Sequence, residues 1–138
     1  MKIAMVGASD PLTFDDRMRL DVASIHIGHA TDDLDIINLN NGRDFLIERR
    51  RYDAVILHSI FHSNRPYAMK LALRTGGTNS SLVHSIERWR KRLVSTHARV
   101  IVVWELLPAA LSGWNLGDLP QYRTKYRDHR ITVYKRAA

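Results

Sequence analysis

Polar side chains follow a buried apolar run near the middle of the chain. The run from Ala54 to Leu57 does not alternate with polar residues, which is typical of a strand covered on both faces of a parallel sheet. The residues after it are His58, Ser59, His62, Ser63 and Asn64. In open α/β sheets, ligands bind at the carboxyl ends of such strands. We therefore expect the functional crevice at this point of the chain.

Two histidines and one acid in this region could do acid–base chemistry. His58 and His62 titrate near neutrality, so either could act as a general base. Glu105 follows the next apolar strand and could position a substrate amine or hydroxyl. A metal site built from the three is disfavoured, because four residues of extended strand separate the histidines by ~13 Å. A buried, hydrogen-bonded histidine is the ordinary explanation, so we expect no metal.

A second candidate site follows the first predicted strand, residues 2–9. The turn after it contains Gly7, Ala8, Ser9 and Asp10, where backbone N–H groups at a helix start can cradle an anion. A single glycine is equally typical of an ordinary tight turn. Ser9 could also be the nucleophile of an SGNH-like esterase, but the chain has no D-x-x-H to supply the base. The esterase is therefore the third choice.

Strand and helix patterns alternate along the chain. We expect Thr13 to be the N-cap of a helix with Asp16 in its first turn. Further elements are predicted as strands at 23–29, 34–39, 53–60 and 99–105, helices at 41–51, 67–73 and from Ser80, and a hairpin over 121–136 turning at Asp128-His129. This order predicts one α/β domain over residues 1–138 with about seven strands. The expected fold class is a three-layer Rossmann-like sandwich with a mostly parallel sheet and a C-terminal antiparallel β-hairpin.

The segment Tyr52-Asp-Ala-Val-Ile-Leu-His-Ser-Ile-Phe-His62 resembles the fourth-strand region of class I S-adenosylmethionine-dependent methyltransferases. The helix and strand over 82–103 and the closing hairpin are similar to later elements of that family. The resemblance implies S-adenosylmethionine or a related nucleotide held by Gly7 to Asp10, with Asp32 or Asp33 contacting the ribose and Asp44 the adenine. It also implies methyl transfer with His58 or His62 as base and Glu105 positioning the acceptor.

The family carries a loop of typically three glycines where this chain has only Gly7. The missing glycines favour an alternative function in another class. This is a non-catalytic, degenerate Rossmann-like module that binds nucleic acid or a protein partner, including a second copy, through its basic surface. The chain has 21 basic and 14 acidic residues, a net charge of +7, which favours a polyanionic partner.

Basic residues form three clusters, at 49–51, 88–92 and 123–136. In the last cluster, Tyr122, Tyr126 and Tyr134 alternate with cations and could stack bases. The simpler interpretation is a hairpin with tyrosines inward and charges outward. The tryptophan of the middle cluster, Trp89, is expected in the core with a solvated basic face beside it.

Composition excludes several classes of function. The chain has no cysteine, which excludes disulfides, thiolate metal sites and cysteine nucleophiles. No apolar run approaches the ~20 residues of a membrane-spanning helix, and the first residues lack a signal-peptide pattern. We therefore expect a cytoplasmic protein without a membrane partner.

Overall fold

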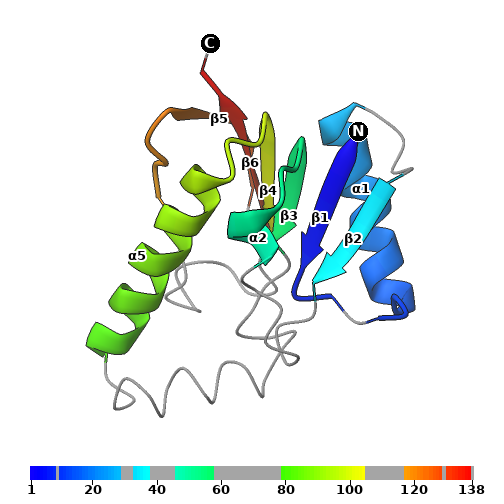
Figure 1. Ribbon diagram of the computed structural model, residues 1–138, viewed down its shortest axis with the longest axis horizontal. Coiled ribbons are helices and arrows are strands. Elements are labelled where there is room, and N and C mark those ends of the chain that lie inside the picture. The colour runs from blue at the N-terminus through cyan, green and yellow to red at the C-terminus, as the bar shows by residue number, and fades with distance from the viewer. Residues whose placement is uncertain are drawn as a thin grey trace.

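The computed structural model describes residues 1–8, 10–28, 33–37, 46–57, 79–104, 117–128 and 130–137. These residues contain six strands and three helices (Figure 1). The strands are β1 (Lys2–Val6), β2 (Asp33–Ile37), β3 (Ala54–Leu57), β4 (Val100–Trp104), β5 (Tyr122–Arg127) and β6 (Ile131–Arg136). The helices are α1 (Phe14–Ile27), α2 (Leu46–Arg49) and α5 (Asn79–Ser95).

The six strands form a single mixed sheet in the order β2-β1-β3-β4-β6-β5. β2, β1, β3 and β4 are parallel, whereas β6 is antiparallel to both of its neighbours, β4 and β5. The expected α/β class, with a parallel core and an antiparallel C-terminal hairpin, is thus confirmed. The hairpin turns where predicted, and the Asp128 N–H donates to the Ile131 carbonyl at 2.9 Å.

Each face of the sheet has its own hydrophobic cluster, because successive strand residues point to opposite sides. Ile3 and Met5 of β1 belong to the cluster that contains α1. Ala4 and Val6 belong to the cluster that contains α2 and α5. All four residues of β3 are buried, which explains why its sequence shows no alternation.

Helix α1 begins as the sequence predicts. The Thr13 hydroxyl accepts a hydrogen bond from the Asp16 N–H at 3.1 Å. The Asp16 carboxylate in turn accepts from the Thr13 N–H at 3.0 Å, which completes a capping box. Two backbone donors of the first turn are thereby satisfied within the helix itself.

Replacing the cap residue should destabilise the protein measurably. We expect Thr13→Ala to lower the free energy of unfolding by about 1 kcal/mol, because the Asp16 N–H loses its acceptor. Urea denaturation checks this value. Thr13→Ser keeps the oxygen and is expected to stay near wild type; equal losses in the two variants would contradict the assigned cap.

The predicted strand at 23–29 is wrong, because α1 continues to Ile27. The helix ends at Gly28, whose φ of 83° is left-handed and whose N–H donates to the Ser24 carbonyl at 2.9 Å. The alternating residues of this segment fit a strand locally. Spacings of three and four, however, place Leu20, Ala23 and Ile27 together against the sheet. Packing selects the helix, and the described sheet has six strands instead of about seven.

The remaining predicted elements agree with the structure where it describes them. The long helix expected from Ser80 is α5, and the short helix expected within 41–51 is α2. The strands expected at 34–39, 53–60 and 99–105 are β2, β3 and β4, with shorter bounds in the described residues. The helix expected at 67–73 lies outside the described residues.

An irregularity in β5 changes the side on which its tyrosines lie. The pairing of β5 with β6 shifts register between Thr124 and Tyr126, as at a β-bulge. One extra residue moves the following side chains to the other face. Tyr122 consequently packs on the α5 side of the sheet. Tyr126 pairs with Val133 on the other side, and its ring centroid lies 5.0 Å from that of His26 in α1.

Candidate functional site

Most of the predicted catalytic and cofactor residues lie outside the described part of the chain. This holds for the three predicted catalytic residues, His58, His62 and Glu105. It also holds for three of the predicted cofactor contacts, Ser9, Asp32 and Asp44. Their roles therefore stay predictions, and only Gly7, Ala8, Asp10 and Asp33 can be placed.

The strand order nevertheless defines where a crevice of this fold would form. In the sheet, β2 lies on one side of β1 and β3 lies on the other side. The direction in which strands are added therefore reverses between β1 and β3. Ligands of open α/β sheets bind at such a reversal, outside the carboxyl ends of the strands. β1 leads there into Gly7, and β3 leads into position 58.

The described part of the turn after β1 offers little to an anion. Gly7 has a left-handed φ of 90°, and its N–H donates to the Ile37 carbonyl at 2.9 Å. Pro11 has no N–H. The first turn of α1 is capped by Thr13 and carries Asp15 and Asp16. A negatively charged group at this helix start would meet two carboxylates.

A cationic cleft lies at the amino ends of β3 and β4, opposite to the carboxyl ends where a ligand of this fold would bind. It has a volume of about 730 Å³ and lies between the α2 region, the end of α5 and the end of β6. Its lining residues are Arg49, Arg50, Arg51, Tyr52, Asp53, Ser95, Thr96, His97 and Arg136. The carboxylate of Asp53 accepts the backbone N–H of Lys2 at 2.8 Å. Four arginines thus line a hollow with a single acid.

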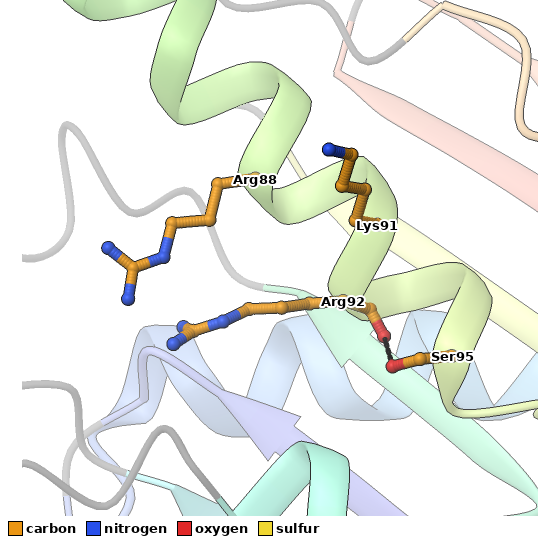
Figure 2. Close-up of a pocket in the computed structure, with 4 residues that line it drawn as sticks. All are labelled: Arg88, Lys91, Arg92 and Ser95. Atoms are coloured by element: carbon orange, nitrogen blue, oxygen red, sulfur yellow. Dashed lines mark hydrogen bonds between the residues drawn. The ribbon is translucent and has the colours of Figure 1, made fainter.

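A second hollow of about 480 Å³ adjoins the first along α5. It is lined by Arg88, Lys91, Arg92 and Ser95, and Ser95 lines both hollows. Figure 2 shows the side chains of Arg88 and Arg92 extending from α5 in the same direction. We call the two hollows together the basic cleft.

Helix α5 divides its residues between the core and the basic cleft. Trp89 is 1% exposed and packs in the cluster between α5 and the sheet, as predicted. Its ring lies 5.2 Å from the Arg92 guanidinium carbon, a cation–π contact. Arg88 and Lys91 are exposed on the same helix. The predicted solvated basic face is therefore confirmed for Arg88 and Lys91, whereas Arg92 is buried at 9% exposure.

The end of α5 is held in an unusual backbone conformation at the cleft. His97 has a φ of 54°, in the left-handed region, and its N–H donates to the Val94 carbonyl at 3.3 Å. Arg136 donates from Nη1 to the His97 carbonyl at 3.3 Å. A cation beside the last carbonyls of a helix offsets the negative end of its dipole. Non-glycine residues in this conformation often lie at functional sites.

One cation of the cleft is neutralised within the structure. Asp35 accepts hydrogen bonds from Arg50 Nη1 at 2.9 Å and from the Tyr52 hydroxyl at 2.8 Å. Burial acts to raise the pKa of Asp35, but the two hydrogen bonds together with the charges of Lys2 and Arg50 outweigh it, so the pKa is lowered. Burial, followed by the hydrogen bond to Asp35, raises the pKa of Tyr52 to about 12. Asp35 thus offsets the charge of Arg50 and holds its side chain in place beside the cleft.

Removing the Tyr52 hydroxyl should reduce stability over a defined pH range. We expect Tyr52→Phe to cost about 1.5 kcal/mol at neutral pH, because a hydrogen bond to a carboxylate is lost. The folded-state pKa of Asp35 is lowered, so its contribution exists above the unfolded pKa of about 4 and disappears as the pH falls through the folded value. The Tyr52 contribution exists below pH ~10 and is lost as the pH rises through about 12.

The difference between wild type and Tyr52→Phe should thus be largest between about pH 5 and 10. Urea denaturation from about pH 2 to pH 10 measures the difference, because the Asp35 contribution is lost only below about pH 4. Tyr122→Phe is the matched control, because the Tyr122 hydroxyl donates at 2.6 Å to the neutral Ala98 carbonyl. We expect the loss of stability in Tyr122→Phe to be independent of pH below about pH 5. A pH-independent loss in Tyr52→Phe would contradict the role given to Asp35.

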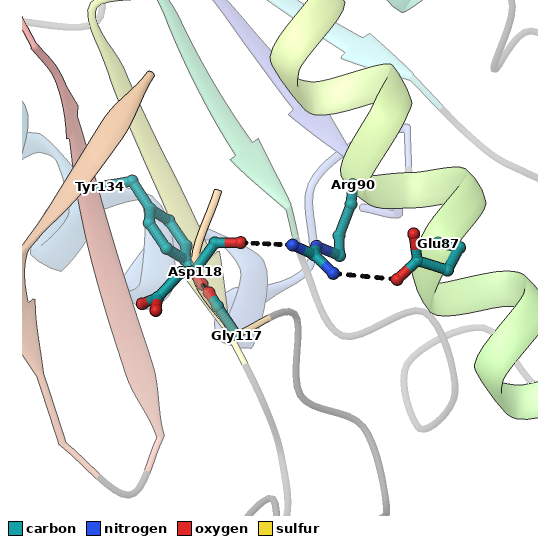
Figure 3. Close-up of polar contacts among 5 residues, drawn as sticks. All are labelled: Glu87, Arg90, Gly117, Asp118 and Tyr134. Carbon is teal, nitrogen blue, oxygen red and sulfur yellow. Dashed lines mark hydrogen bonds and ion pairs between the residues drawn. The ribbon is translucent and has the colours of Figure 1, made fainter. Parts of the chain in front are cut away.

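Arg90 points away from the basic cleft. Its guanidinium donates to Glu87 at 2.9 Å and to the Asp118 carbonyl at 2.7 Å, as Figure 3 shows. The first contact lies within α5, and the second joins α5 to the segment before β5. Beside them, the Tyr134 hydroxyl donates to the Gly117 carbonyl at 2.7 Å (Figure 3). This side of α5 therefore holds the helix against the segment before β5.

The hairpin is not a base-stacking surface of three tyrosines. Tyr134 is 1% exposed, and Tyr122 packs against the core with its hydroxyl bonded. Tyr126 alone of the three is exposed, at 43%. The prediction of inward tyrosines with outward charges is confirmed for Tyr122 and Tyr134, and the bulge explains the exception.

Comparison of the chain with protein-family models, with curated proteins and with solved structures finds no match. Among the described residues, no helix is both long and apolar enough to cross a membrane. The same residues contain no group of three histidine, aspartate or glutamate side chains that could hold a metal ion.

Proposed function

We propose that the protein binds nucleic acid through the basic cleft. The observation that carries the proposal is the convergence of cations from three distant segments. Arg49 and Arg51 come from the segment before β3, Arg88 and Lys91 from α5, and Arg136 from the end of β6. Cations gathered on one surface neutralise phosphates and release counterions, which supplies sequence-independent affinity.

The shape of the basic cleft favours an extended polyanion over a small phosphate compound. The exposed cations Arg51, Arg88 and Lys91 line two hollows that share Ser95, and they do not enclose a single point. From Arg88 to Ser95 the helix spans ~10 Å. A strand carries one phosphate per nucleotide, so more than one phosphate can lie along this length. Backbone contacts of this kind position a nucleic acid without reading its sequence.

The experiment is a fluorescence anisotropy titration with labelled single-stranded RNA, single-stranded DNA and duplex DNA at low salt. We expect binding that tolerates scrambling of the sequence and weakens as salt rises. The preference among the three probes identifies the natural class of ligand. No change in anisotropy with any of the probes at low salt would refute the proposed function.

A second candidate function rests on the reversal of strand order between β1 and β3. We propose in this case that the domain is a three-layer Rossmann-like sandwich of the methyltransferase-like type. S-adenosylmethionine would bind at the carboxyl ends of these strands, near Gly7 to Asp10, with His58 or His62 as the base. The cluster on each face of the sheet supports the layered architecture.

Calorimetric titration with S-adenosylhomocysteine tests the second candidate. Gly7→Val is unsuitable for the control, because a β-branched residue at a φ of 90° would strain the fold itself. Asp10→Asn is preferable, since Asp10 is exposed. We expect micromolar binding to wild type and weaker binding to the variant. Absence of heat at high ligand concentration would refute cofactor binding and leave the basic cleft unaffected.

A further inference from the structure

Helix α1 exposes a row of large apolar side chains on the side away from the sheet. Phe14 is 77% exposed, Met18 53%, Val22 40% and Ile25 78%. Their spacings of four, four and three residues place them on one face of the helix. A different set of residues packs α1 against the sheet, so this row is not needed for the core. We call these four residues the α1 stripe.

Contiguous exposed apolar surface of this kind marks an interaction site. The neighbouring charges indicate what the α1 stripe contacts. Arg17 and Asp21, both exposed, lie four residues apart along one side of the stripe. A cation and an anion in this arrangement are self-complementary in an antiparallel pair of identical helices. Arg17 of each copy then lies opposite Asp21 of the other.

The apolar residues match in the same arrangement. When two copies of α1 cross antiparallel near residue 20, Met18 lies opposite Val22 of the second copy, and Phe14 lies opposite Ile25 of the second copy. Large side chains thus face smaller or branched ones along the seam. A two-fold axis of this kind gives the closed, isologous interface typical of dimers.

The helix ends also favour the antiparallel orientation. The first turn of α1 carries Asp15 and Asp16, and the last turn carries His26. Parallel packing would bring the exposed Asp15 carboxylates and the like ends of the two helix dipoles together. Antiparallel packing places each acidic N-terminus beside the C-terminal end of the other helix, where the two dipoles also oppose.

We propose that the protein forms a symmetric homodimer in which the α1 stripe packs against the same stripe of a second copy. The contact is one helix per copy, at the small end of specific interfaces, so we expect a weak dimer whose mass depends on protein concentration. α1 and the basic cleft belong to opposite faces of the sheet. Dimerisation therefore leaves both clefts accessible and can be tested without nucleic acid.

Sedimentation velocity over a range of concentrations tests the proposal. We expect the mass to rise from 15.9 kDa toward twice this value as the protein is concentrated. Ile25→Glu should remove the dimer, and the variant should fold because the side chain is 78% exposed. A wild-type mass of 15.9 kDa at every concentration would overturn the proposal, as would an unchanged dimer in Ile25→Glu.

A charge reversal tests the antiparallel geometry. Arg17→Asp should weaken dimerisation about tenfold, since it places like charges opposite each other. The double variant Arg17→Asp with Asp21→Arg exchanges the two charges and should restore most of the affinity. Arg123→Asp, the same charge change on β5, is the control and should leave the dimer unchanged. Failure of the double variant to recover, with circular dichroism showing a folded protein, would overturn the antiparallel packing.

Discussion

Replacing Arg51, Arg88 and Lys91 together with Gln is expected to weaken nucleic-acid binding about 100-fold near 0.1 M salt. Each of these exposed cations would neutralise one phosphate in the basic cleft. Three lost contacts at ~0.7 released counterions each give a loss of this size for a single strand. Gln has nearly the helix propensity of Arg and Lys, so α5 should keep its stability.

The matched control removes the same charge from the hairpin. Arg123→Gln with Lys125→Gln and Arg127→Gln also neutralises three exposed cations, all on β5. We expect this variant to lose less than about threefold in affinity, because only the long-range field of the protein changes. Equal losses in the two triple variants would contradict a localised site and would indicate that net charge alone attracts the nucleic acid.

Trp89→Ala should be the most destabilising substitution on α5. Trp89 is among the largest fully buried side chains and fills the space between the helix and the sheet. Large-to-small changes of this kind cost about 3–5 kcal/mol, which is a large part of the stability of a typical domain. Chemical denaturation measured by far-UV circular dichroism gives the value.

Arg88→Ala is the control for Trp89→Ala, because Arg88 is the neighbouring residue and its side chain is exposed. We expect it to change the free energy of unfolding by less than about 0.5 kcal/mol. Trp89→Phe should fall between the two, since it keeps an aromatic ring beside Arg92. A loss below about 1 kcal/mol in Trp89→Ala would contradict the position of α5 on the sheet.

Local sequence patterns predicted the elements wherever one physical requirement dominated. The unbroken run of β3 and the cap at Thr13 each had a single local explanation, and both are confirmed. The prediction failed at the end of α1, because two rows of apolar residues overlap in the sequence there. Leu20 and Ala23 face the sheet, whereas Val22 and Ile25 form a second apolar row, and the mixture resembles strand alternation. The sequence alone cannot show which row is buried.

The basic cleft was predictable only in its parts. The clusters at 49–51 and 88–92 are evident from composition, but about forty residues separate them along the chain. Their convergence follows from the parallel pairing of β3 with β4, a long-range contact. The residues of the third cluster, 123–136, lie in two places. Arg136 lines the cleft, whereas Arg123 and Arg127 lie on the edge strand β5. The bulge that turns Tyr126 outward has no clear local signature either.

The most direct test of nucleic-acid binding at the basic cleft is the salt dependence of affinity for a single-stranded oligonucleotide. Anisotropy titrations at several salt concentrations should give a log–log slope of about −3 to −4 for wild type. In Arg51→Gln with Arg88→Gln and Lys91→Gln, the slope should be shallower by about 2, whereas the hairpin control should keep the wild-type slope. A wild-type slope near zero, or the same slope in the cleft variant as in wild type, would contradict binding at the cleft.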